Sequence, residues 1–201
     1  MRYPKLRELG EALRSLFFRP YTSSFPKVPH KPAERFRGKP EYFEKYCVGC
    51  LACEEVCPAN TIEHEDITEG NKPIRRITLH LDVCQFCGNC QANCITEKGI
   101  QLTQKFELST FDRKDATSVV EKELVLCQDC GEIIACKDHL VWIAEKIGPL
   151  AFSNPTLFLS KLKVLGIVDK DLGRTVIEGL TRGDRMKIIC AKCRRKTTFE
   201  D

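Results

Sequence analysis

The sequence lacks any apolar run long enough to cross a membrane as a helix. Its longest candidates, residues 16–18 and 164–168, fall far short of the roughly 20 residues that a span needs. The N-terminus lacks the apolar core and the small-residue cleavage site of a secretory signal. No phosphate-cradling glycine loop and no nucleophile–base signature is present. We therefore expect a non-secreted, non-spanning protein that carries no catalytic machinery of those kinds.

Cysteine, in contrast, is abundant, with 13 among 201 residues. Eight of them form two copies of the spacing C-x2-C-x2-C-x3-C, which holds [4Fe–4S] clusters in bacterial-type ferredoxins. Three closely spaced thiolates reach three corners of one cubane, and the fourth ligates the other cluster in two-cluster domains. The spacing therefore predicts a first cluster held by Cys47, Cys50, Cys53 and Cys94, and a second cluster held by Cys57, Cys84, Cys87 and Cys90.

Two other readings of these runs are weaker. Zinc sites usually take two ligands from each loop, and a disulfide framework needs a secretory context. The small residues Gly49, Ala52, Gly88 and Asn89 suit loops whose backbone approaches a cluster closely. Pro58 follows the first run, whereas Ile95 follows the second, which affects the expected loop shape but not the ligand set. Clusters and free thiols together indicate a reducing, cytosolic setting.

An amphipathic helix is expected over residues 4–19, because Leu6, Leu9, Leu13 and Leu16 recur at helical spacing. Such a helix can lie on a membrane surface, dock on a partner, or cover its own domain. Residues 20–46 contain five prolines, which favour extended chain. A segment of this length without local structure is uncommon inside a compact domain, so we expect residues 1–46 to form a docking helix and arm.

Residues 47–110 are expected to form the two-cluster ferredoxin domain of an α+β protein. Strands are predicted over residues 61–64, 75–81 and 99–103, with a turn at 69–71. Each half then contains a cysteine run, a short helix and a strand, which indicates an internal repeat. A linker of mixed charge is expected over residues 112–118.

Residues 111–201 contain two C-x2-C pairs, Cys127 with Cys130 and Cys190 with Cys193. Four thiolates can hold one tetrahedral metal ion, so the pairs predict a zinc-ribbon-like or rubredoxin-like extension with one Zn²⁺ or Fe. The gap between the pairs is longer than in an ordinary ribbon. Helical patterning at 140–147, 156–165 and 172–180 fills that gap, and a helical insertion can leave the pairs adjacent in space.

Cys136 is left over. With His139 it could replace one pair as ligands, but beside Ile133 and Ile134 it is more typical of a buried small hydrophobe. The histidines His30, His64 and His80 are expected to be ordinary surface or packing residues. The basic residues Lys192, Arg194, Arg195 and Lys196 are expected to form a solvated run of charge.

The order of these features resembles one family. An amphipathic helix, a proline-rich extension, the stretch Phe36–Glu41 and two cluster runs are similar to the ferredoxin-like subunit of complex I and of membrane-bound group 4 [NiFe] hydrogenases. The tail pairs and the stretch Cys190–Lys196 resemble the corresponding subunit of formate hydrogenlyase. The tail insertion is longer than that family's tail.

The resemblance implies a non-catalytic relay subunit with two [4Fe–4S] clusters. Its implied partners are an upstream iron–sulfur subunit, the small and large hydrogenase subunits and membrane subunits. It implies a peripheral position on the cytoplasmic side of the cell membrane, with residues 4–19 along the surface.

Three alternatives stay open: a relay subunit of a complex I-like quinone oxidoreductase, a free soluble ferredoxin, and, more remotely, a nucleic-acid-binding zinc ribbon. The net charge of +4 is only a mild basic bias, and the tail lacks the interleaved aromatic residues of a base-stacking surface. No nucleic-acid partner is therefore expected.

Overall fold

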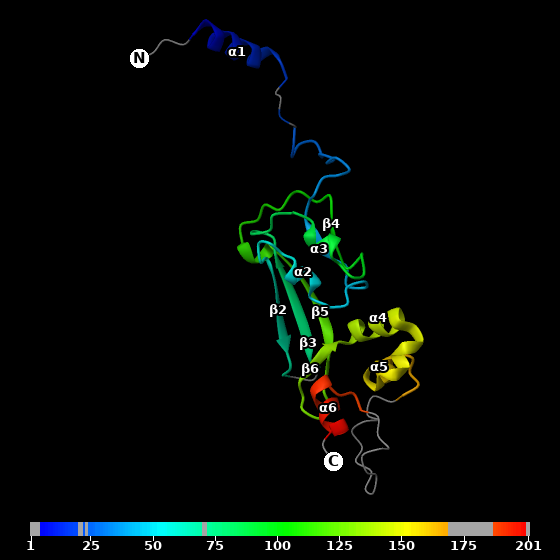
Figure 1. Ribbon diagram of the computed structural model, residues 1–201. Helices are drawn as coiled ribbons and strands as arrows, with labels where there is room; N and C mark the ends of the chain where they lie inside the picture. Colours follow the sequence, from blue (N-terminus) through cyan, green and yellow to red (C-terminus); the bar gives the residue numbers. More distant parts are fainter. Residues whose placement is uncertain (1–4, 20–21, 23, 70–71, 169–186, 200–201) are drawn as a thin grey trace. The chain divides into compact units, whose positions relative to one another are not determined.

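The computed structural model describes residues 5–19, 22, 24–69, 72–168 and 187–199. It divides into two compact units, Met1–Phe36 and Arg37–Asp201. The second unit combines strands and helices, so the predicted α+β class is confirmed (Figure 1).

The first unit contains the helix α1 (Leu6–Phe17). Its N-terminus is capped by Glu8, whose carboxylate accepts the backbone N–H of Lys5 at 3.0 Å. The helix predicted over residues 4–19 is therefore confirmed, although it is shorter at both ends. No residue of α1 is buried within the unit, and Leu6 and Phe17 are 91% and 84% exposed. Its apolar side chains thus stabilise nothing within the unit itself.

The extended arm expected over residues 20–46 ends earlier than predicted. Residues 40–42 form β1 (Pro40–Tyr42), which pairs antiparallel with β4 (Ile100–Leu102). The pairing continues before β1, where the N–H of Gly38 donates to Thr103 O at 2.9 Å. A proline at the first position of a strand is tolerated, so Pro40 is compatible with β1.

The main sheet has four antiparallel strands in the order β2-β3-β5-β6 (Figure 1). They are β2 (Ile62–Ile67), β3 (Ile74–His80), β5 (Thr117–Leu126) and β6 (Ile133–Cys136). The strands predicted over 61–64, 75–81 and 99–103 are confirmed as β2, β3 and β4. The predicted turn at 69–71 lies partly outside the described residues.

The prediction of a linker over residues 112–118 is wrong at its C-terminal end, where a strand has already begun. A short 3₁₀ helix, η1 (Arg113–Asp115), is followed at once by β5. The buried positions in the middle of β5 are Val120, Lys122 and Leu124, so a lysine interrupts the apolar alternation that would have predicted a strand. Because β5 pairs with β3, the sheet crosses the boundary expected between residues 110 and 111, and the domain division stays a prediction.

Helices occupy the loops and the tail of the second unit. Two are short, α2 (Ala52–Glu55) and α3 (Asn89–Ala92). After β6 come α4 (Lys137–Ile147), the 3₁₀ helix η2 (Gly148–Ser153), α5 (Pro155–Val164) and finally α6 (Ala191–Phe199). The helices predicted over 140–147 and 156–165 are confirmed, whereas the one predicted over 172–180 lies outside the described residues. None of the helices in the described part of the chain has the length and apolar character that a membrane crossing requires.

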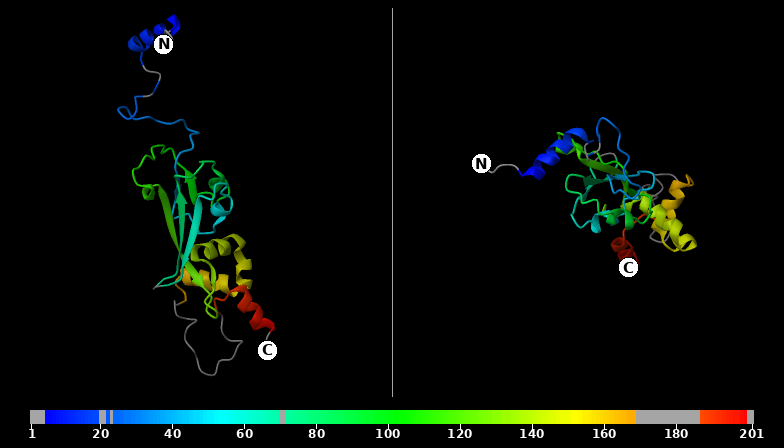
Figure 2. Two further views of the ribbon diagram at one scale, coloured as in Figure 1. Left: turned by 90° about the vertical axis from the view of Figure 1, so that its left-hand side faces the viewer. Right: turned by 90° about the horizontal axis from the view of Figure 1, so that it is seen from above.

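Two hydrophobic cores hold the second unit together. The larger joins α2, β2, β3, β4 and β5 through the buried residues Cys53, Ile62, Ile77, Leu79, Leu81, Ile100 and Val120. The smaller lies between α4, η2 and α5, which contact one another (Figure 2). Full burial of a Leu or Ile side chain contributes about 1.5–3 kcal/mol, so the larger core can hold both cysteine runs in one frame.

Candidate metal centres

The two cysteine runs fold into two copies of one loop. In the first copy Gly49 and Leu51 take positive φ, and in the second Phe86 and Gly88 do so. Each positive-φ turn leads into a one-turn helix, α2 after Leu51 and α3 after Gly88. The internal repeat predicted from spacing is therefore present in the backbone, and it places the third cysteine of each run on a helix.

A small, partly open cavity lies against the first loop. Four cysteines line it, Cys47, Cys50, Cys53 and Cys94, together with core residues such as Tyr42, Ile77 and Ile100. Cys94 reaches this cavity from the other cysteine run. These four are the residues that the spacing predicted for the first cluster.

The second cavity repeats this arrangement. Its four cysteines are Cys57, Cys84, Cys87 and Cys90, and its walls include Pro40, Ile62 and Leu79. Cys57 comes from the first run, just after α2. The structure thus brings together both crossed sets of cysteines, while their role as cluster ligands stays a prediction.

Hydrogen bonds reach several of these sulfur atoms. The backbone N–H of Thr61 donates to Cys57 Sγ at 3.3 Å, and that of Phe86 donates to Cys84 Sγ at 3.4 Å. The hydroxyls of Thr61 and Thr96 lie 3.2 and 3.3 Å from the sulfurs of Cys57 and Cys94. No sequence pattern pointed to either threonine, since neither lies inside a cysteine run.

The cysteines of each cavity differ in pKa. Burial raises the pKa of Cys53 to about 12 and that of Cys90 to about 11. Burial also acts to raise the pKa of Cys57 and Cys94, but hydrogen bonds from Thr61 and Thr96 bring both below the ordinary thiol value. Buried thiols of raised pKa give up their protons when a metal cation replaces them. Four sulfurs around each cavity, with backbone N–H groups that donate to sulfurs such as those of Cys57 and Cys84, fit a [4Fe–4S] cluster in each.

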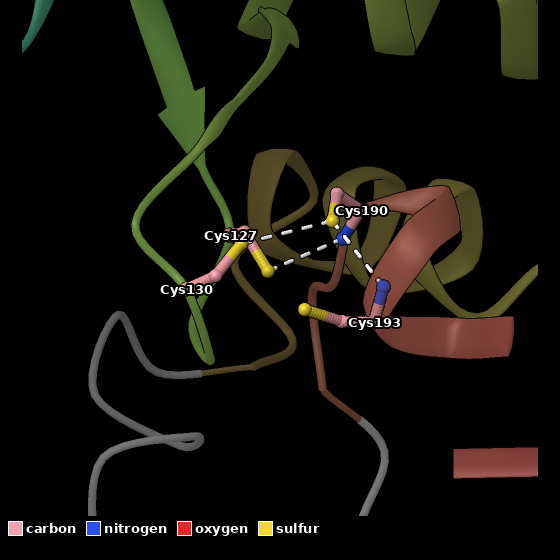
Figure 3. Close-up of side chains that lie close together, drawn as sticks. All are labelled: Cys127, Cys130, Cys190 and Cys193. Carbon is pink, nitrogen blue, oxygen red and sulfur yellow. Dashed lines mark hydrogen bonds between the residues drawn. The ribbon is translucent and has the colours of Figure 1, made fainter. Parts of the chain in front are cut away.

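A third group of cysteines lies at the far end of the main sheet. Cys127 and Cys130 follow β5, while Cys190 and Cys193 lie at the start of α6 (Figure 3). All four sulfurs lie within 4.8 Å of one another, and Cys130 Sγ is 3.8 Å from Cys190 Sγ. A tetrahedral zinc with bonds of about 2.3 Å places its sulfurs about 3.8 Å apart. The pairs are adjacent in space despite the long insertion, and their spacing fits one metal ion.

Backbone contacts join the two halves of this four-cysteine site. The N–H of Gln128 donates to Ile188 O at 2.9 Å, and the Gln128 side chain accepts the N–H of Ile188 at 2.8 Å. The N–H of Cys190 donates to Cys127 Sγ at 3.3 Å. Segments about 60 residues apart are therefore held together by the protein itself, so that the sulfurs are positioned in advance.

The thiols of the four-cysteine site are also unequal. Burial acts to raise the pKa of Cys127, but backbone N–H groups of Cys130, Cys190 and Asp129 lower it to about 6. Hydrogen bonding to Cys130 and burial raise the pKa of Cys193 to about 12. A cation that binds here would displace the protons that the thiols carry.

The spare cysteine, the histidines and the basic tail lie outside the three cysteine sites. Cys136 is fully buried and, like His139, is outside the four-cysteine group, which agrees with its reading as a small core residue. His64 and His80 bond to Glu54 and Glu63 at the surface. The reading of the basic tail as a solvated run is wrong in part, because Arg194 donates to Thr156 Oγ1 at 2.7 Å.

Residues 46–98 match the family model of the 4Fe–4S dicluster domain. Among curated proteins, the chain is 34% identical over 100 residues to the NAD(P)H-quinone oxidoreductase subunit I of Gloeobacter violaceus, covering 48% of this chain and 47% of that protein. It is 33% identical over 120 residues to formate hydrogenlyase subunit 6 of Escherichia coli, covering 59% and 64%. The chain thus spans about half to two thirds of the length of these two relatives.

A third relative is covered more fully. The chain is 34% identical over 127 residues to NADH-quinone oxidoreductase subunit I 1 of Symbiobacterium thermophilum, covering 57% of this chain and 77% of that protein. Among solved structures, a chain of the membrane-bound sulfane sulfur reductase, an archaeal respiratory membrane complex, is matched with 27% identity and a TM-score of 0.39, covering 58% of this chain and 61% of that one. The resemblance seen in the sequence is confirmed, and the chain belongs to the family of NADH-quinone oxidoreductase subunit I.

Proposed function

We propose that this chain is an electron-relay subunit of a membrane-associated, complex I-like assembly of the formate hydrogenlyase type. Two [4Fe–4S] clusters, held by the two crossed cysteine sets, would supply one-electron transfer. The chain's own residues would hold the clusters in one frame, shield them and set their potentials. The implied partners are an upstream iron–sulfur subunit and the small subunit of a hydrogenase, on the cytoplasmic side.

One observation carries this proposal. Two cavities, each lined by four cysteines and each completed by a cysteine of the opposite run, share one hydrophobic core. Tyr42 lines the first cavity and Pro40 the second, so a single strand, β1, contributes to both walls. Ligands that cross between sites couple the positions of two clusters, as a relay requires.

The helix α1 supports attachment to a larger assembly. Its apolar side chains are exposed within its own unit, and a free carrier has no use for such a surface. We propose that it lies on a membrane surface as a peripheral anchor. In the tail, we propose that the four-cysteine site binds one Zn²⁺ as a structural ion, since tetrahedral sulfur ligation suits zinc and both halves are already joined by backbone hydrogen bonds.

The test begins with the full chain, purified anaerobically with its partners from membranes. Metal analysis of the chain, once separated from its iron-containing partners, should give about eight irons and one zinc. Ser at Cys47 and Ser at Cys94 should alter the same electron paramagnetic resonance signal, whereas Ser at Cys57 should alter the other. Loss of different signals in the first two variants would contradict the crossed sets.

A relay in a complex I-like quinone oxidoreductase is the second candidate, favoured by the two subunit I relatives. The co-purifying subunits decide between the two assemblies: a nickel–iron hydrogenase pair supports the first, and quinone-reducing subunits support the second. A redox-active monomer that needs no membrane partner would contradict both and support a free ferredoxin.

A further inference from the structure

A row of four charged side chains crosses the main sheet beneath the first cysteine loop. Asp66 on β2 is the cross-strand partner of Arg75 on β3, and Arg75 is the cross-strand partner of Lys122 on β5. Lys122 in turn bonds to Asp138 in the first turn of α4. The two cations therefore occupy the centre of the row, although like charges directly opposite each other destabilise a sheet.

Both cations are turned toward the first loop. Lys122 Nζ donates to Glu44 O at 2.6 Å, three residues before Cys47. Arg75 Nη1 donates to the carbonyl oxygen of Gly49, between Cys47 and Cys50, at 3.2 Å. These contacts place two positive charges directly behind the cysteines that line the first cavity.

The two cations differ in how far their carboxylates offset them. Arg75 makes two bonds of 2.7 Å to Asp66, and both side chains are mostly buried, so this pair is close to neutral where it stands. Lys122 is only 9% exposed, whereas its partner Asp138 is 51% exposed. Water screens the outer charge far more than the inner one, so Lys122 leaves a net positive field at the loop.

The second cavity has no equivalent among the described residues. Neither cavity has a charged side chain in its lining, so the difference lies in the groups that bond to the loop from behind. The basic group that bonds to its loop is Arg37, whose Nη1 donates to Cys87 O at 2.8 Å from an exposed position. Because an exposed cation is screened by water, its effect on the second cavity is weaker than that of Lys122 on the first.

A [4Fe–4S] cluster becomes more negative by one charge when it is reduced, and a nearby buried cation favours that state. We propose that Lys122 raises the reduction potential of the cluster held by Cys47, Cys50, Cys53 and Cys94 above that of the other cluster, so that an electron on this subunit rests at the first site. The inference rests on the proposed function, because it requires both clusters to be present. Lys122 acts as a positioning charge and is not a ligand.

The experiment is a redox titration of the full chain with both clusters loaded, followed by electron paramagnetic resonance. Dithionite supplies one electron to each cluster, from the 2+ to the 1+ state, with no bond formed or broken. The signal that Cys47→Ser alters identifies the first cluster. Lys122→Met should lower the midpoint potential of that signal and leave the other unchanged, while Lys122→Arg should keep the wild-type value.

A matched control is Lys137→Met, which removes a cation that is 42% exposed and pairs with Glu123, the neighbour of Lys122 on β5. It should shift neither signal. Equal shifts of both signals in Lys122→Met, no shift, or the same shift in Lys137→Met would overturn the proposal.

The wild type offers a test that does not depend on any variant folding. Its first-cluster signal should have the higher midpoint potential, and the reverse order would overturn the inference. Failure of the proposed function looks different, because a wild-type chain that binds fewer than two clusters would give one signal or none.

Discussion

The substitution Gly49→Ala tests whether the first loop depends on its contact with the tail of the chain. Gly49 has φ +70°, and a Cβ at this position would lie 2.6 Å from Cys136 Sγ and 3.3 Å from Lys122 Cβ. A left-handed conformation costs an L-residue about 1–2 kcal/mol, and overpacking a filled core adds about 1–3 kcal/mol. The change should therefore destabilise the native loop by about 2–5 kcal/mol.

The matched control is Gly166→Ala. Gly166 has φ +69° and nothing within 4 Å of an added Cβ, so it isolates the backbone cost of about 1–2 kcal/mol. Proteins with bound cofactors do not unfold in two states, so the measurement is the rate at which cluster absorbance is lost in guanidinium under anaerobic conditions. A difference of 1.4 kcal/mol corresponds to a factor of ten in rate. The overpacking cost of about 1–3 kcal/mol therefore predicts that Gly49→Ala loses its clusters about 5- to 150-fold faster than Gly166→Ala does.

A second substitution checks the cause. Adding Cys136→Ala to Gly49→Ala removes the closest of the clashing atoms and should recover part of the lost stability, as a double-mutant cycle would measure. The reasoning is refuted if Gly49→Ala loses its clusters no faster than Gly166→Ala. It is also refuted if the two substitutions at the contact prove additive.

Three further predictions follow from single contacts. Gly38→Ala would place a Cβ against the carbonyl oxygens of Lys105 and Thr103, so it should speed amide hydrogen exchange at the β1–β4 pair. Gly10→Ala is the neutral control, because nothing lies within 4 Å of a Cβ added there. Cys190→Ser should abolish the tail metal while iron stays at about eight per chain, and loss of iron would contradict separate sites. Hydrogen bonds from Arg75 lower the pKa of Asp66, so their contribution is present above the ordinary carboxyl range and lost as the pH falls through the lower folded pKa. The stabilities of wild type and Asp66→Asn should therefore begin to converge as the pH falls below about 4, and a constant difference would sink the assignment.

The cysteine sets were the most predictable part of the molecule. Spacing alone separated Cys57 and Cys94 from their own runs, and the structure places each at the opposite cavity. This worked because a cubane imposes its geometry on a short stretch of sequence. The helix α1 was equally predictable, because Leu6, Leu9, Leu13 and Leu16 repeat at helical spacing and no residue of the helix is buried in a core.

The strand β5 was not predicted from the sequence because a lysine interrupts its apolar pattern. Lys122 occupies an inward position between Val120 and Leu124, where the alternating pattern requires an apolar residue. A buried lysine is tolerated only when its charge is hydrogen-bonded, and its partners Glu44 and Asp138 are distant in sequence. Positions where a sequence pattern fails in this way are often functional. The inward position of Lys122 therefore explains both why β5 was not predicted and why this residue is proposed to set the potential of the first cluster.

The strand β5 also connects the tail to the first cluster, which raises the question of whether the tail metal governs Lys122. Lys122 is paired with Arg75 inside a register that joins β5 to β3 from Thr117 to Glu123. The register with β6 shifts between Val125 and Leu126, so the strand is irregular just before Cys127. The pairing with β3 therefore holds Lys122 independently of whatever happens at Cys127. A metal at the four-cysteine site would stiffen the end of the β5–β6 hairpin, while the charge beneath the first loop depends on β3. The two roles of the tail are physically separable, and a chain without the tail metal should keep the potential of its first cluster.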